Sequence, residues 1–188
     1  MNTLHIESPR AALLLTLSLV LAAVLPGCGG GDTTARASAP ATPLTLKEQI
    51  AALEKSGALP ALDRSTDVKG PDANNNGVRD DIDAWIAALP VTDTQKKAAM
   101  QTARGLQIKM TVDLTDQAAL QRAAERSAAA TNCIWDVFEP NPQNGSDLSK
   151  KIEAMTANTR ERAQRYLQYN TARSGSVTSL PEGNTCEE

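Results

Sequence analysis

One stretch of the sequence, residues 72–83, carries oxygen-bearing side chains at a spacing suited to holding a metal ion. It reads Asp-Ala-Asn-Asn-Asn-Gly-Val-Arg-Asp-Asp-Ile-Asp. Gly77 permits a sharp turn of the backbone, and the carbonyl group of Val78 would add one main-chain oxygen. Calcium takes about six to eight oxygen ligands, so this spacing predicts a Ca²⁺ site. The predicted ligands are Asp72, Asn74, Asn76, Val78, Asp80 and Asp83.

The same residues also suit a turn that holds no metal. Asn and Gly favour tight turns, because both tolerate a left-handed backbone. Asp80 would cap the helix that follows, and Asp81 and Asp83 would favour the positive N-terminal end of that helix. A capped turn is therefore the alternative interpretation of this stretch.

The stretch resembles the calcium loops of the EF-hand family, and more closely those of its dockerin and thrombospondin type 3 relatives. These loops follow the pattern D-x-[DN]-x-[DN]-G-x-x-D-x-x-[DE], which residues 72–83 match. The sequence departs from a full EF-hand where Gly70 and Pro71 replace an entering helix, and where Arg79 replaces the usual apolar residue. Asp83 also replaces the usual bidentate Glu. The resemblance implies a structural calcium ion of moderate affinity, and the departures argue against a paired sensor that opens and closes.

The N-terminal region has the pattern of an export signal. Arg10 precedes residues 11–24, fourteen residues without a charge that are rich in Leu and Ala. This run is shorter than the roughly 20 residues of a membrane-spanning helix, and Pro26 ends it. We therefore expect residues 1–27 to be a cleaved signal peptide.

Leu25-Pro26-Gly27-Cys28 resembles the lipobox of bacterial lipoproteins. The resemblance implies cleavage before Cys28 and attachment of three acyl chains, which together form a stable membrane anchor. Gly29, in place of Asp, implies the outer membrane, with the protein on its periplasmic side. Residues 28–44 would form a flexible tether, since they are mostly Gly, Ala, Ser, Thr and Pro. The alternative is an ordinary secretory signal that carries a chance cysteine.

Once Cys28 is acylated, Cys133 and Cys186 are the remaining cysteines of the chain. They are too far apart in sequence for a redox or zinc CxxC motif. In an exported protein such a pair is expected to form a disulfide, which would fix residues 174–188 to the domain. The alternative is a buried Cys133 with an exposed Cys186 that pairs between molecules.

The helical signals predict an all-α domain over residues 45–173, an irregular bundle of about five helices. Capping boxes begin two of them, at Thr45 with Glu48 and at Thr92 with Gln95. The fifth and longest helix is expected to follow a turn at residues 144–146 and to continue to about residue 173. The other four are expected at about residues 45–57, 80–89, 92–109 and 117–132.

Composition restricts the function. Lys and Arg number 19 against 22 Asp and Glu, a net charge of −3, and so no nucleic-acid partner is expected. The single histidine, His5, lies in the predicted signal peptide, which excludes histidine chemistry from the mature protein. Trp85 and Trp135 are expected to pack in the core, and the basic residues of the fifth helix to form a solvated face.

The acidic residues outside the loop stand in no recognisable catalytic frame, so the sequence favours a protein that is not an enzyme. The first hypothesis is a lipid-anchored calcium-binding protein that acts as a structural or interaction module, with an envelope protein or polymer as its partner. The second is an envelope hydrolase that uses acidic residues. The third is a periplasmic inhibitor or chaperone-like binder.

Overall fold

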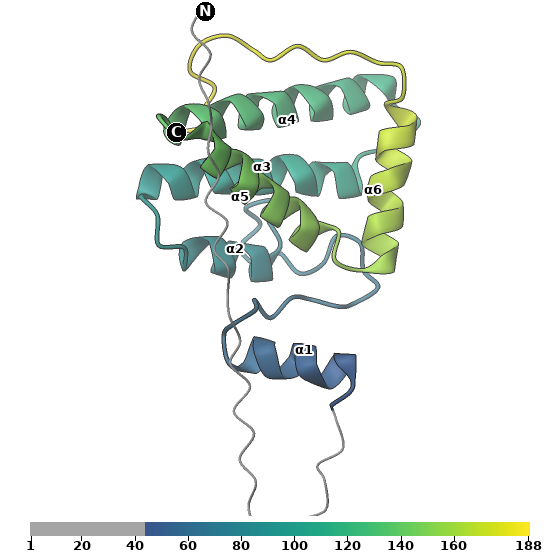
Figure 1. Cartoon of the computed structure of the whole chain (residues 1–188). Helices are drawn as coiled ribbons and strands as arrows, with labels where there is room; N and C mark the ends of the chain where they lie inside the picture. The colour runs from purple at the N-terminus through teal and green to yellow at the C-terminus, as the bar shows by residue number, and fades with distance from the viewer. Residues whose placement is uncertain (1–43) are drawn as a thin grey trace, which may run out of the picture. The chain divides into compact units, whose positions relative to one another are not determined.

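The computed structural model describes residues 44–188, and within this range the regular elements are six α-helices (Figure 1). No β-strand occurs among the described residues, so the prediction of an all-α fold is confirmed. The predicted signal peptide, Cys28 and nearly all of the predicted tether lie outside the described residues. The helices are α1 (Leu46–Lys55), α2 (Asp80–Ala87), α3 (Asp93–Thr111), α4 (Gln117–Val137), α5 (Pro142–Thr156) and α6 (Arg160–Ala172).

Helix α3 organises the packing of the domain, because α2, α4, α5 and α6 all pack against it. Figure 1 shows α3 and α4 side by side, with α5 across them and α6 at one end. Helices α3 and α4 approach closely at small residues, since a Cβ at Gly105 of α3 would lie 3.5 Å from Ser127 and 3.9 Å from Ala130 of α4. Ile82, Ile134 and Ile152 supply bulk to the main core.

The helix starts follow the capping signals of the sequence. The Thr45 side chain accepts a hydrogen bond from the Glu48 N–H, and the Glu48 carboxylate accepts one from the Thr45 N–H at 2.8 Å. Thr92 and Gln95 form the same reciprocal pair at the start of α3. Both predicted capping boxes are therefore confirmed, and each satisfies N–H groups that a helix end leaves free.

The predicted fifth helix is wrong as one element, because the structure divides it into α5 and α6. Pro142 starts α5 at its first turn, so residues 144–146 lie inside this helix and form no turn. The break falls at residues 157–159, where the Thr159 side chain caps α6 by accepting from the Arg162 N–H. Apolar residues keep a helical spacing on both sides of the break, and the spacing alone therefore does not reveal it.

Gly145 is placed where α5 meets α4 at very short range. A Cβ atom at this position would lie 2.6 Å from the Ile134 carbonyl oxygen, a backbone atom that cannot turn aside. We expect Gly145→Ala to lower the free energy of unfolding by about 1–3 kcal/mol, as overpacking does. Gly105→Ala is the matched control, because its Cβ would meet its nearest neighbour at 3.5 Å. Urea unfolding of both variants measures the difference, and equal stabilities would contradict the prediction.

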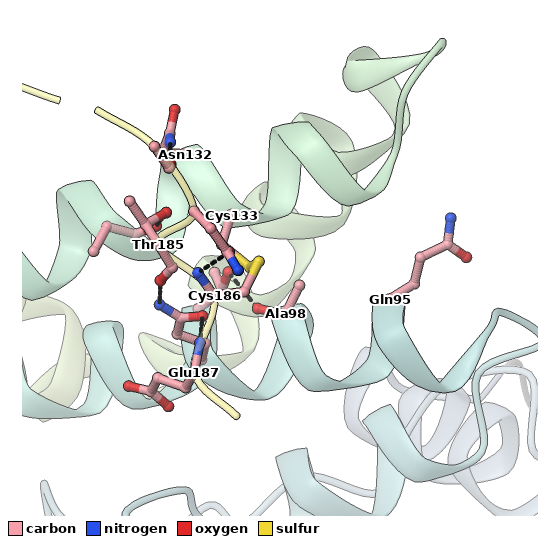
Figure 2. The surroundings of a disulfide bond; sticks show 12 residues. Gln95, Ala98, Asn132, Cys133, Thr185, Cys186 and Glu187 are labelled. Atoms are coloured by element: carbon pink, nitrogen blue, oxygen red, sulfur yellow. Dashed lines mark hydrogen bonds between the residues drawn. A yellow bond between two sulfur atoms is a disulfide. The ribbon is translucent and has the colours of Figure 1, made fainter. Parts of the chain in front are cut away.

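The C-terminal tail runs back over the domain and is fixed between α3 and α4 (Figure 2). A disulfide joins Cys133 of α4 to Cys186, so the predicted pairing is present in the structure. The Gln101 side chain donates to the Thr185 carbonyl at 2.8 Å and accepts from the Glu187 N–H at 3.1 Å. The tail thus gains its order from the cross-link and from polar contacts, since it has few apolar residues to bury.

Candidate metal site

Residues 72–79 form a closed loop directly before α2, and residues 80–83 form the first turn of that helix. Asn75 and Gly77 have positive φ angles of 54° and 80°, which curl the chain. The Asp80 N–H donates to the Pro71 carbonyl at 2.9 Å, and the Ala73 N–H donates to Asp80 Oδ1 at 3.0 Å. These bonds join Pro71 and Ala73 at the start of the loop to Asp80 at the start of α2.

Four of the predicted ligands share one hydrogen-bond network. Asp83 Oδ2 accepts from the Asn74 amide at 2.9 Å and from the Asn76 amide at 2.8 Å. The two carboxylate oxygens of Asp72 accept from the Asn76 and Gly77 N–H groups at 3.1 and 3.2 Å. Side chains that are nine and seven residues apart along the chain therefore meet at one carboxylate oxygen, as ligands of a common ion must.

The remaining two predicted ligands, Asp80 and Val78, make other hydrogen bonds. The Asp80 carboxylate accepts from the Ala73 N–H, and the Val78 N–H donates to Asn76 Oδ1 at 2.8 Å. The expected capping of α2 by Asp80 is wrong, because Asp80 is the first residue of the helix and Arg79 occupies the N-cap position without a side-chain cap hydrogen bond. Among residues 44–188, no group of three or more His, Cys, Asp or Glu side chains could hold a metal by itself. A cation in the loop would therefore depend on the amide oxygens of Asn74 and Asn76, and on the Val78 carbonyl, in addition to the carboxylates. This oxygen-only set fits a hard ion such as Ca²⁺.

The loop is held firmly against the rest of the domain. Val78 and Ile82 are each 1% exposed and belong to the main core. On the other side, Gly77 faces Arg104 of α3, since a Cβ at Gly77 would lie 3.6 Å from its side chain. Arg104 also pairs with Glu187 of the tail. The loop, α3 and the disulfide-linked tail thus form one continuous set of contacts.

Arg79 is a residue whose role the sequence did not indicate. It is fully buried, and its guanidinium group makes a two-point ion pair with Asp81 at 2.6 and 2.8 Å. It also donates to the Met155 carbonyl at 3.0 Å, at the C-terminal end of α5. The position that is apolar in related loops therefore holds a buried cation that links the loop to α5. Gly70 is required beside it, because a Cβ there would lie 2.4 Å from the Arg79 side chain.

Arg162 corrects the prediction of a solvated basic face on the fifth helix. It is fully buried and pairs with Asp63. It also donates to the main-chain carbonyls of Asp63 at 2.7 Å and Asp67 at 2.8 Å. Arg165 likewise donates to the Met110 carbonyl, near the C-terminal end of α3. These cations bind main-chain carbonyl groups of segments distant in sequence. Their helical spacing with acidic residues does not reveal this role.

Asp63 links stability to pH. Partial burial acts to raise its pKa, but hydrogen bonds from Arg162 and Ser65 outweigh this and lower the pKa from 3.8 to about 2. Because the pKa is lower in the folded state, the stabilisation is complete above pH 3.8 and is lost as the pH falls toward 2. We expect the contribution to be about 1–2 kcal/mol after solvent screening. Urea unfolding of the native protein and Asp63→Asn between pH 5 and 2 measures it, and a stability difference that stays constant would contradict it.

The two tryptophans have different surroundings. Trp85 of α2 is half-buried and packs against the core, as expected. Trp135 of α4 is 37% exposed, and its indole N–H donates to the Ser146 hydroxyl at 3.0 Å, so its expected place in the core is wrong. One end of this side chain needs a polar partner, which lies at the surface.

Two further findings concern the chain as a whole. Within residues 44–188, none of the helices is both long enough and apolar enough to cross a membrane. Comparison of the chain with protein-family models, with curated proteins and with solved structures found no match in any of the three.

Proposed function

We propose that this chain is an exported lipoprotein, anchored in the outer membrane on its periplasmic side through acylated Cys28. Its helical domain holds Ca²⁺ in the loop of residues 72–83 and acts as a structural or interaction module of the cell envelope. The observation that carries the calcium proposal is the convergence of Asn74 and Asn76 on one Asp83 oxygen, at 2.9 and 2.8 Å. The anchor is supported by the sequence pattern of residues 11–28.

The ion would be held by the carboxylates of Asp72, Asp80 and Asp83, the amide oxygens of Asn74 and Asn76, and the carbonyl of Val78. It would offset the repulsion among the three carboxylates that gather round it. In the structure, the NH₂ groups of Asn74 and Asn76 donate to Asp83, and their oxygens accept from the Asn76 and Val78 N–H groups. Binding the ion would exchange these hydrogen bonds for bonds between the amide oxygens and the metal.

The task of the ion would be structural. The last four residues of the loop, 80–83, form the first turn of α2, and its residues Val78 and Arg79 are buried against the core and α5. Fixing the loop would therefore fix the start of α2 and the Arg79 contacts together. A domain of this kind presents a stable surface to an envelope protein or polymer.

Terbium luminescence tests the calcium proposal, because Tb³⁺ takes the same oxygen ligands and is excited by a nearby indole. Trp85 lies two residues beyond Asp83, so the full-length protein in detergent supplies its own sensitiser. We expect sensitised emission that calcium displaces. Calcium at about one hundred times its Kd should also raise the free energy of unfolding by about 2.7 kcal/mol.

Two variants distinguish Tb³⁺ binding in the loop from non-specific binding of Tb³⁺ to acidic side chains. Asp72→Asn removes one charged ligand of the loop and should abolish or strongly weaken the emission. Asp67→Asn removes an exposed carboxylate outside the loop, so its emission should match that of the native protein. Absent emission, together with a Tm that millimolar calcium leaves unchanged, would show that residues 72–83 form a turn that holds no metal.

A further inference from the structure

The first helix of the described chain exposes its apolar side chains to solvent. None of the residues of α1 is buried. Leu46 is 73% exposed and Leu53 is 45% exposed, and the flanking Leu44 and Leu59 are exposed as well. A short amphipathic helix is marginal in water unless its apolar face is covered, and so this face requires an explanation.

The apolar residues of α1 form one stripe. Leu46, Ile50 and Leu53 are spaced by four and three residues, which places them on the same side of the helix. α1 is not among the helix pairs of the domain that pack closely. An ion pair from Glu54 to Arg64 joins it to the following segment, and a hollow of about 630 Å³ lies beside Leu46 and Ile50. The fold of residues 44–188 thus supplies little cover for the stripe.

The position of α1 in the sequence indicates what covers the stripe. Leu44 follows Cys28 by 16 residues, counting residues 29 through 44. Such a segment spans at most about 55 Å even when fully extended. If Cys28 carries acyl chains, as the proposed function holds, α1 stays close to the lipid surface at a high effective concentration, and a weak affinity for lipid is then sufficient.

We propose that α1 lies in the headgroup layer of the membrane that holds Cys28, with Leu46, Ile50 and Leu53 turned into the lipid. This inference rests on the lipid anchor of the proposed function. Stable protein interfaces bury about 800 Å² on each partner, which is more than a stripe of three side chains on a ten-residue helix provides. Lys47 stands at the side of the stripe, where its stem can lie along the lipid and its ammonium group can reach the phosphates.

The test places an added indole on each side of α1 in the full-length protein. Leu53→Trp puts it on the stripe, and Ala52→Trp puts it on the flank away from the stripe; both positions are exposed. Trp85 and Trp135 give the same background in both variants. Each variant is reconstituted into vesicles of phosphatidylethanolamine and phosphatidylglycerol, with or without bromine on the acyl chains. We expect the bromine to quench the added emission about twofold at position 53 and to have little effect at position 52.

Flotation of the same vesicles reports on the anchor separately. Protein that floats without a difference in quenching between the two variants overturns the inference and leaves the anchor in place. Protein that does not float contradicts the anchor. In that case, quenching at position 53 with vesicles in excess would still support the contact of α1 with lipid. No quenching at position 53 would overturn that contact as well. A blue-shifted emission at position 53 that bromine does not quench overturns the inference, since it indicates that a protein surface covers the stripe.

Discussion

Replacing Arg162 by Ala is expected to lower the free energy of unfolding by about 3–5 kcal/mol, as is usual when one partner of a buried ion pair is removed. Arg162 has no exposed surface, and its side-chain hydrogen bonds end on the segment of residues 63–68, apart from one to Asn158 Oδ1 at 2.9 Å. The variant leaves the Asp63 carboxylate without its main partner. It also leaves the carbonyls of Asp63 and Asp67 without their Arg162 donor, a desolvation cost that an exposed arginine would not carry.

Arg160→Ala is the matched control for this variant. Arg160 lies two residues earlier on the same helix but is exposed, so its loss should change stability by less than about 0.5 kcal/mol. Urea unfolding followed by circular dichroism measures both variants. Arg162→Met is a second test, because it keeps the volume of the side chain while removing all donors. A loss below about 1 kcal/mol in both Arg162 variants would show that the ion pair is not what holds residues 63–68 to α6.

The fold class could be predicted from the sequence because its signals are local. Capping boxes at Thr45 and Thr92 act within four residues, and the starts of the first four helices agree with the structure to within about one residue. The division of the fifth helix was missed although Thr159 is a residue type that favours helix N-caps, because the apolar spacing continues across the break. Contacts distant in sequence also hold the start of α6. Arg162 draws the start of α6 toward residues 63–68, which lie about one hundred positions earlier in the chain.

The loop of residues 72–83 was also found from local spacing, and the structure brings Asp72, Asn74, Asn76 and Asp83 together through hydrogen bonds. What local spacing did not reveal is the support of this loop. Arg79 follows the loop pattern poorly in sequence, yet it is the residue that connects the loop to α5. The glycine at position 70 is the sequence feature that goes with the buried Arg79. Gly70 has a positive φ of 69°, and its lack of a Cβ leaves room for the Arg79 side chain. A glycine two residues before a predicted metal loop, followed by a buried arginine within it, is a pattern that only packing explains.

The second large effect is expected from the disulfide, in the double variant Cys133→Ala/Cys186→Ala. The cross-link closes a loop of 54 residues, counting residues 133 through 186, whose chain entropy corresponds to about 4 kcal/mol. We therefore expect the variant to lose about this much stability in urea unfolding, and the tail of residues 174–188 to exchange its amide hydrogens rapidly.

Two comparisons separate the cross-link from the contacts around it. Reduction of the native protein breaks the S–S bond without changing side-chain volume, so its loss of stability should equal that of the double variant within about 1 kcal/mol. Gln101→Ala removes both hydrogen bonds that α3 makes to the Thr185 and Glu187 main chain while the disulfide stays intact. It should cost about 1–2 kcal/mol. If Gln101→Ala lowered the free energy of unfolding as much as reduction does, the cross-link would not be the main attachment of the tail. The polar contacts of the tail with α3 would then hold it in place.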